Sequence, residues 1–275
     1  MVGLSGDGDT DSSVMQEDAI FQDIVIANYM DSYKNLSYKA LTAMHWVKTY
    51  CSTPEHIVKM DDDIVVNPFV LARYLDLRLK KKRAKENHLN ALGVINDSKE
   101  SVSLFNSFGT NRSNNNHLQA SEENLLTGSN INEISHSKPT LIGSIDCYGI
   151  YPWGLPVIRD NTSQWYVSEA EYLPDLYPNY CSGMAFIMDA EVPPLLLEAS
   201  LESRFLWVDD VFLTGVLRDK CAIPIVSINS MYEQDMELFH QSVLSGETMF
   251  MHTPVDDIKF FSFIWNALLT KEHQV

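Results

Sequence analysis

Three consecutive aspartates, Asp61–Asp63, separate two apolar runs in the stretch HIVKMDDDIVVNPF. Neighbouring carboxylates about 5 Å apart repel each other by roughly 3 kcal/mol at an effective dielectric constant of about 20. The apolar residues before them predict a short strand over 56–60, so the aspartates follow its carboxyl end. A divalent cation with oxygen ligands, such as Mg²⁺, Ca²⁺ or Mn²⁺, would neutralise this cluster. The alternative interpretation is an acidic turn that holds no ligand.

A strand that continued through the triplet would direct two of the three carboxylates to one side. Because side chains alternate along a strand, Asp61 and Asp63 would share a face and Asp62 would lie on the other. The first and third carboxylates could then serve one ligand together. One of them would bind a metal ion and the other a neighbouring hydroxyl group.

Predicted strands and helices alternate along the rest of the chain. The predicted strands are 21–29, 56–60, NYCSGMAFIMD and AIPIVSI. The predicted helices are NLSYKALTAMHWVKTYC, the stretch that begins at Pro68, VPPLLLEASLES, VDDVFLTGVLRDK and VDDIKFFSFIWNALL. This alternation favours an α/β layer fold with a mainly parallel sheet, in which ligands bind at the carboxyl ends of the strands.

Two segments have no such pattern. Residues 1–17 lack a basic region and an apolar core, so they are not a signal peptide and are expected to be a disordered lead-in. Residues 83–140 are rich in Asn and Ser, which is typical of a disordered insertion. The expected domain therefore spans 18–275, with an interruption at 83–140. No apolar run reaches about 18 residues, so no membrane span is predicted.

The charge of the chain limits its partners. A net charge of -17 over 275 residues argues against nucleic acid or an anionic membrane surface. The same charge is compatible with metal ions or neutral sugars as ligands. Six of the 20 basic residues lie in Arg78–Lys85. Such a run is more often a solvated helix end than a phosphate-binding patch.

The cysteines and glycosylation sequons leave the cellular compartment open. The cysteines allow three pairings if two disulfides form, and free thiols are the alternative; they are Cys51, Cys147, Cys181 and Cys221. Four sequons weakly favour a secretory location, at Asn35, Asn96, Asn111 and Asn161.

A second acidic pair and a late histidine are further candidates for chemistry. Asp209 and Asp210 follow an apolar run and begin a predicted helix. Their simplest role is to cap that helix and interact with its dipole, but beside a metal site one of them could be a catalytic base. His252 is either a structural side chain or a metal ligand.

Four blocks in a fixed order now point to a known family. They are DSYKNLSYKALTAMHWVKTYC, VKMDDDIVVNPF, WYVSEAEYLPDLYPNYCSG and VDDVFLTG, and they are spread over the chain from Asp31 to Gly215. Together they resemble the β-1,3-glycosyltransferases, the β-1,3-galactosyltransferase and β-1,3-N-acetylglucosaminyltransferase type of family 31. The resemblance implies a GT-A fold, in which a Rossmann-like nucleotide half joins an acceptor half. It also implies inverting transfer from a UDP-sugar in the Golgi lumen.

The resemblance assigns the metal and donor residues. It implies that Asp63 binds Mn²⁺ directly and that His252 completes the metal site. Asp61, Asp62 and Gly183 would lie on the donor side, around the uridine diphosphate. A divalent cation there would stabilise the negative charge that develops on the leaving diphosphate.

The resemblance also assigns the catalytic and acceptor residues. Asp210 would be the general base that takes a proton from the acceptor hydroxyl group, with Asp209 as its neighbour. Trp165, Tyr166 and Tyr180 would line the acceptor side. Metal and base are needed on opposite faces of the sugar, as in the base role of an inverting glycosidase.

Further expectations follow from the same resemblance. Only 30 residues precede its first block, so the chain is expected to be N-terminally truncated, without the family's uridine-holding first strand or its type II membrane anchor. A disulfide between Cys181 and Cys221 is implied. The expected activity is galactosyl transfer from UDP-galactose to a glycan on a glycoprotein or glycolipid. The alternatives are N-acetylglucosaminyl transfer, an inactive relative that binds a complete enzyme, and a carboxylate metal hydrolase.

Overall fold

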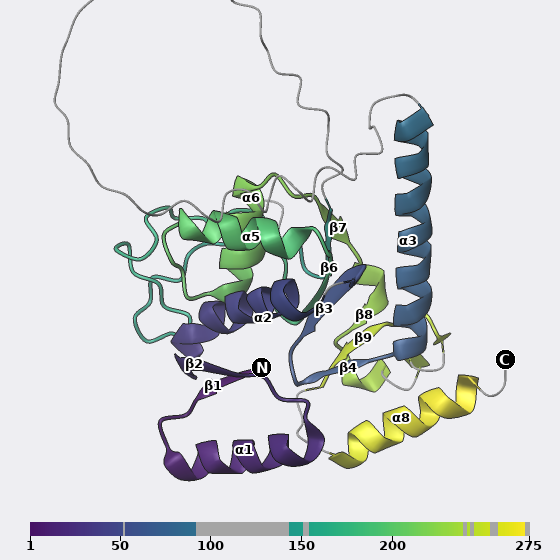
Figure 1. Cartoon of the computed structure of the whole chain (residues 1–275), viewed down its shortest axis with the longest axis horizontal. Coiled ribbons are helices and arrows are strands. Elements are labelled where there is room, and N and C mark those ends of the chain that lie inside the picture. Colours follow the sequence, from purple (N-terminus) through teal and green to yellow (C-terminus); the bar gives the residue numbers. More distant parts are fainter. Residues whose placement is uncertain are drawn as a thin grey trace, which may run out of the picture. The chain divides into compact units, whose positions relative to one another are not determined.

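The computed structural model describes residues 1–51, 53–91, 143–150, 154–238, 241–242, 245–253 and 258–272 (Figure 1). The chain divides into two compact units, Met1–Leu79 with Ile142–Val275, and Lys80–Leu141. Within the second unit, only a helical stretch at 80–91 is described. Most of the expected insertion at 83–140 therefore lies outside the described residues, but its first part, up to Ala91, is helical.

The described elements alternate along the chain much as the sequence predicts. The strands are β1 (Val2–Leu4), β2 (Ile26–Met30), β3 (His56–Met60), β4 (Ile64–Val66), β5 (Ile145–Cys147), β6 (Ala185–Asp189), β7 (Ile225–Ser227), β8 (Tyr232–Glu233) and β9 (Phe250–His252). The α-helices are α1 (Gly8–Phe21), α2 (Leu36–Tyr50), α3 (Pro68–Ala91), α5 (Val192–Leu201), α6 (Arg218–Lys220) and α8 (Ile258–Glu272). The segment η2 (Val211–Leu217) is π-helical, and short 3₁₀ turns are η1 (Tyr33–Asn35), η3 (Asn229–Met231) and η4 (Met236–Leu238).

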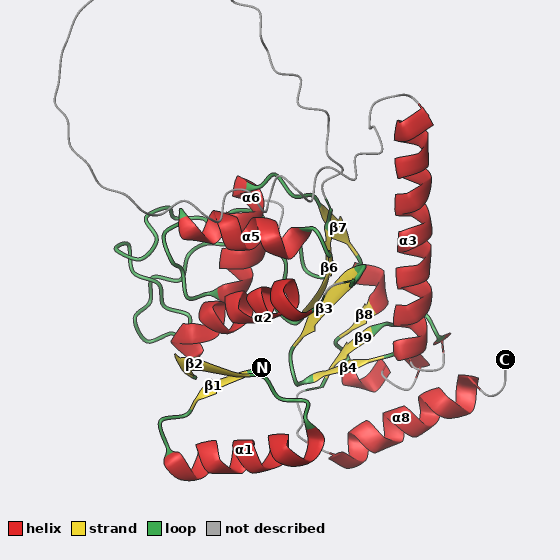
Figure 2. Cartoon of the chain, in the orientation of Figure 1, coloured by secondary structure: helices red, strands yellow, loops and turns green. Residues whose placement is uncertain are grey.

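The central sheet is mixed, so the expectation of a mainly parallel sheet is wrong. Its strand order is β3-β6-β5-β7, and Figure 2 labels β3, β6 and β7 in it. Strand β6 runs antiparallel to both β3 and β5, and only β5 and β7 are parallel. Two parallel neighbours need a crossover of a dozen or more residues, usually a helix. The described residues between β5 and β6 contain no helix, and β6 returns antiparallel beside β5.

Strand β6 is the most buried element of this sheet. All five of its residues are buried. Phe186 and Met188 pack into a hydrophobic cluster with residues of α2, α5 and η2. Ala185 and Ile187 pack into a second cluster, which includes residues of β4, α3 and β9. Because successive side chains of a strand point to opposite faces, this division shows that both faces of the sheet are covered.

The N-terminal residues are ordered, so the expectation of a disordered lead-in at 1–17 is wrong. Strand β1 pairs in parallel with β2, and the Gly3 amide donates to Asp31 Oδ2 at 2.9 Å. Helix α1 follows, although it buries none of its residues. Its first turn is held by Asp7, whose carboxylate accepts from the amides of Asp9 and Thr10, both at 3.3 Å. The sequence signal of this helix is its N-terminal cap, not a row of apolar residues. A search for apolar periodicity therefore misses the helix.

The long helix α3 is fixed to the sheet by a buried arginine. The helix begins at Pro68, a position that proline favours. The Asn67 side chain caps this start and accepts from the amide of Val70 at 3.2 Å. Arg78, with only 11% of its side chain exposed, lies 2.7 Å from Asp146 and 2.7 Å from Asp189. It also contacts His56 Nδ1 at 3.0 Å. The solvated helix end expected at Arg78–Lys85 therefore does not include its first residue.

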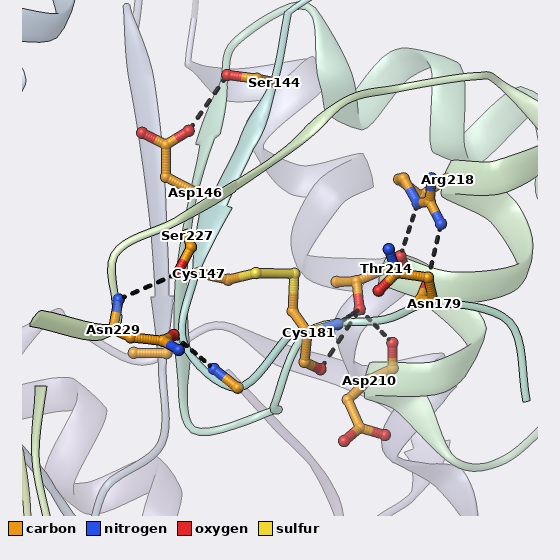
Figure 3. Close-up of a disulfide and its surroundings, with 12 residues drawn as sticks. Ser144, Asp146, Cys147, Asn179, Cys181, Asp210, Thr214, Arg218, Ser227 and Asn229 are labelled. Atoms are coloured by element: carbon orange, nitrogen blue, oxygen red, sulfur yellow. Dashed lines mark hydrogen bonds between the residues drawn. A yellow bond between two sulfur atoms is a disulfide. The ribbon is translucent and has the colours of Figure 1, made fainter. Parts of the chain in front are cut away.

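One disulfide joins β5 to the segment before β6. Cys147 and Cys181 are bonded, with 5.8 Å between their Cα atoms (Figure 3). The implied Cys181–Cys221 pair is wrong, because Cys147, at the buried end of β5, is the partner of Cys181. Cys51 and Cys221 are free thiols. No helix within the described residues is both long and apolar enough to cross a membrane.

Candidate active site

The aspartate triplet forms a turn between β3 and β4. Strand β3 ends at Met60, as predicted, so the aspartates follow its carboxyl end and strand alternation does not apply to them. The Asp61 amide donates to the Met184 carbonyl at 2.9 Å, and the Asp61 carbonyl accepts from the Ile64 amide at 3.3 Å. Asp62 is exposed, whereas Asp61 and Asp63 are partly buried. The turn therefore buries the first and third side chains of the triplet in part and exposes the second. Strand alternation is not the cause of this difference.

Lys59 links the start of this turn to the segment that precedes β6. Its Nζ lies 2.5 Å from Asp61 Oδ1 and donates to the Gly183 carbonyl at 2.5 Å. Burial raises the pKa of Asp61, and the charges of Asp209 and Asp63 raise it further, while Lys59 lowers it. The aspartate triplet and the Asp209–Asp210 pair are far apart in the sequence, but in the fold the charge of Asp209 is close enough to raise the pKa of Asp61.

Asp63 and His252 are brought together by the pairing of β4 with β9. Ile64 lies opposite His252 in the register, and His252 Nε2 is 3.3 Å from Asp63 Oδ2. The amide and hydroxyl groups of Thr253 donate to the Asp63 carbonyl at 2.8 and 3.0 Å. Among the described residues, the other carboxylate oxygen, Oδ1, is buried without a hydrogen-bond partner.

This pair fits a divalent cation. A buried carboxylate oxygen without a partner is rare in proteins, and a metal ion would satisfy it. Carboxylate and imidazole ligands both suit Mn²⁺. The described residues contain no cluster of three or more His, Cys, Asp or Glu side chains that could hold a metal alone. The remaining ligands would have to be water and phosphate oxygens, as is common for such sites.

Asp210 is the most perturbed acid of this group. Burial, and next the charge of Asp209, raise the pKa of Asp210 to about 6. Its carboxylate accepts from the Val211 amide at 2.7 Å, so it caps η2, and the Gly183 amide and Lys59 also stabilise its charged form. A methyl group at Gly183 would approach Asp210 Cβ to 3.2 Å. A carboxylate of this pKa near neutral pH is suited to general base catalysis.

The three predicted acceptor-side residues are not equivalent. Trp165 is 46% exposed, and its indole N–H donates to the Tyr33 hydroxyl oxygen at 2.8 Å. The Tyr166 carbonyl accepts from Lys34 Nζ at 3.2 Å. Tyr180 is only 7% exposed and lies in the hydrophobic core. Tyr180 is therefore a packing residue in this structure.

Sequence reasoning missed two residues of this region and one residue of β3. Tyr33 and Lys34 belong to the DSYKNL block, which indicates the family but assigns no role to either residue. Lys59 lies in β3, two residues before the triplet. Its charge in an otherwise apolar strand was the available signal, because an unpaired buried lysine would be costly.

The fold and the site together define the class of this protein. Its mixed α/β core is consistent with a GT-A type glycosyltransferase. The chain belongs to the galactosyltransferase family, whose model, described as "Galactosyltransferase", matches residues 1–119 and 133–229.

Individual relatives support this membership. β-1,3-Galactosyltransferase 1 of Mus musculus is 28% identical over 218 residues, which is 79% of this chain and 48% of the relative. The Homo sapiens protein of the same name matches equally. β-1,3-Galactosyltransferase 2 of Mus musculus is 21% identical over 274 residues, 99% of this chain and 50% of the relative. The chain thus spans about half the length of these relatives. The family resemblance found in the sequence is confirmed.

Proposed function

We propose that this protein transfers galactose from UDP-galactose to an acceptor glycan, forming a β-1,3 linkage with inversion of the anomeric carbon. The family match and the names of the relatives support the reaction class. The observation that carries the proposal is the convergence of Asp210 with Lys59 and the aspartate turn around Gly183. It provides a base and a cation-binding edge in one region.

Asp210 is the base in this proposal. Its ionised carboxylate accepts the proton of the acceptor hydroxyl group as that oxygen bonds to the anomeric carbon and the bond to the diphosphate breaks. Attack from the face opposite the leaving group inverts the configuration. Asp209 raises the pKa of Asp210, which makes it a stronger proton acceptor near neutral pH.

Asp63 and His252 would hold Mn²⁺, with Asp61 and Asp62 facing the donor. When bound, the cation neutralises the negative charge that develops on the departing diphosphate. The unpaired oxygen of Asp63 and its contact with His252 are the observations that favour this assignment. Lys59 contacts both Asp61 and the Gly183 carbonyl, and the Gly183 amide bonds the Asp210 carboxylate. The donor side and the base are therefore held by the same residues.

The unit β1–α1–β2 is our candidate for the uridine side. Its strands are parallel and joined by a helix, the arrangement of half a nucleotide-binding fold. Ligands of such units lie at the carboxyl ends of the strands, which here is the region after Leu4. Strand β1 lies within residues 1–17, where the sequence predicted no strand.

We place the full-length protein in the Golgi lumen as a type II membrane protein, acting on glycoproteins or glycolipids. The Cys147–Cys181 disulfide favours an oxidising compartment. The Golgi location and the membrane anchor are proposed from the family match, and fluorescence microscopy of the full-length protein tests them.

The test is a transfer assay with purified protein, Mn²⁺ and either UDP-galactose or UDP-N-acetylglucosamine, with NMR of the product linkage. Asp63→Asn and Asp210→Asn should each lower transfer by at least about a hundredfold, because each removes a charge that the reaction needs. The exposed Asp175→Asn is the matched control and should retain activity.

Three results would count against the proposal. Preference for the N-acetylglucosamine donor would favour the alternative branch of the family. Full activity in Asp210→Asn would remove the base role. No heat on titration of UDP with Mn²⁺, together with no transfer, would indicate a non-catalytic relative.

A further inference from the structure

We propose that Thr214 is a positioning residue for Asp210, which it ties to the segment anchored by the Cys147–Cys181 disulfide. The inference rests on the proposed role of Asp210 as the base. Thr214 touches none of the reacting atoms in this scheme, and it acts only through the residue that does.

The hydroxyl group of Thr214 makes two hydrogen bonds in opposite directions. Its oxygen donates to the Asp210 carbonyl at 2.6 Å and accepts from the Cys181 amide at 2.9 Å (Figure 3). The 3.5 Å approach to the Cys181 carbonyl is too long to compete with either bond. Thr214 is fully buried, so water cannot replace these contacts. One side chain therefore connects the base residue to the disulfide-bonded segment.

The bond from Thr214 to the Asp210 carbonyl spans four residues, an arrangement that threonine side chains also adopt in α-helices. What distinguishes Thr214 is that its oxygen also accepts from the Cys181 amide, outside the helix. The segment η2 that holds it is π-helical. Short π-helical turns occur often at functional sites, in agreement with the position of this one directly after the base.

A second contact holds the same helix to the same segment. Arg218, one turn further on, donates to the Asn179 carbonyl at 2.7 Å through Nη2 and to the Thr214 carbonyl at 3.0 Å through Nε. Figure 3 shows Arg218 and Thr214 on one side of the helix, facing Asn179 and Cys181. The segment 179–181 is thus attached to two successive turns of the helix and, through the disulfide, to β5.

The same segment continues into the groups that contact the carboxylate of Asp210. Gly183 lies two residues after Cys181, and its amide bonds the Asp210 carboxylate. The Gly183 carbonyl accepts from Lys59. A shift of η2 against this segment would therefore move the base relative to both groups. Displacements of about 1 Å in a catalytic group can cost about a hundredfold in rate.

Thr214→Val is the direct test, because it keeps the shape and removes the hydroxyl group. We expect kcat to fall by about tenfold or more, while KM for UDP-galactose stays within about twofold, since the donor-side residues are unchanged. Thr214→Ser should restore most of kcat. An unchanged kcat in Thr214→Val, a loss that appears mainly in KM, or no rescue by serine would each overturn the proposal.

The matched control is Thr42→Val. Thr42 donates to the Tyr38 carbonyl at 2.7 Å, the same four-residue arrangement, but in α2. It should leave kcat unchanged. Thermal unfolding, and a native count of two accessible thiols from Cys51 and Cys221, verify the fold and the disulfide of each variant. If Thr214→Val does not fold, Thr214→Ala replaces it with the same expected outcomes.

A readout without activity separates this inference from the proposed function. Carbon-13 NMR of the Asp210 carboxyl group should give a pKa near 6 in the unmodified protein and a higher pKa in Thr214→Val, because the stabilising Gly183 contact is weakened. Thr214→Ser should return it. An identical pKa in all three proteins would refute the positioning role even in a chain that transfers no sugar.

Discussion

At the scale of the residue, the properties that suit Asp210 to catalysis also reduce stability. Burial disfavours its charged form, so its pKa is raised from 3.8 to about 6. Between these two values the folded protein holds a proton that the unfolded chain releases. Folding is therefore favoured by this group at low pH, and that contribution is lost as the pH rises through about 6. At neutral pH the folded state carries the cost of a buried charge.

Asp210→Asn should remove this cost. We expect the free energy of unfolding to rise by about 1–3 kcal/mol at pH 7.5, since one unit of pKa corresponds to about 1.4 kcal/mol. Transfer activity should be lost in the same variant. Urea unfolding at pH 7.5 and pH 4 measures the effect, which should be much smaller at pH 4, where the native aspartic acid is protonated. Equal stabilisation at both pH values would contradict this explanation.

At the scale of the element, local signals predicted the elements well but not their partners. The start of α3 at Pro68 and the buried β6 were predicted correctly, because each depends on residues close in sequence. Strand direction, the Cys147–Cys181 pair and the burial of Arg78 depend on residues more than 30 positions apart, and periodicity has no information on them. The acidic clusters and the late histidine were recognised from their own residues, and the family resemblance assigned the base and metal roles among them. The structure adds the contacts of Lys59 and Thr214, whose roles depend on folding.

Arg78 offers a test at this scale. Arg78→Met should lower the free energy of unfolding by about 3–5 kcal/mol, because it leaves Asp146 and Asp189 buried without their cation. Lys81→Met, an exposed position in the same basic run, should change it by less than about 0.5 kcal/mol. Chemical denaturation of both variants decides the matter. Equal effects would mean that Arg78 does not anchor α3 to the sheet.

At the scale of the whole molecule, one covalent link closes a long stretch of chain. Cys147 and Cys181 are 34 residues apart, and the loop between them includes Trp165 and Tyr166. The disulfide restricts the unfolded chain and holds this loop beside β5. It therefore stabilises the proposed acceptor-side loop and the segment that supports η2 together.

Replacing both Cys147 and Cys181 with Ala should lower the free energy of unfolding by about 2–4 kcal/mol. Cys51→Ser, which changes a free thiol, is the control and should have little effect. Differential scanning calorimetry of the two variants makes the comparison. An undiminished melting temperature in the double variant would show that the disulfide has no part in stability.

The burial of β6 on both faces has a consequence for how such a protein can diversify. Strand β6 begins two residues after Gly183, so any change of volume beneath the sheet is passed to the carboxylate of Asp210, the proposed base. Selection for a new acceptor has little freedom there. The exposed surface around Trp165 is not constrained in this way, so under the proposed function the choice of acceptor sugar can change there while the chemistry beneath stays the same.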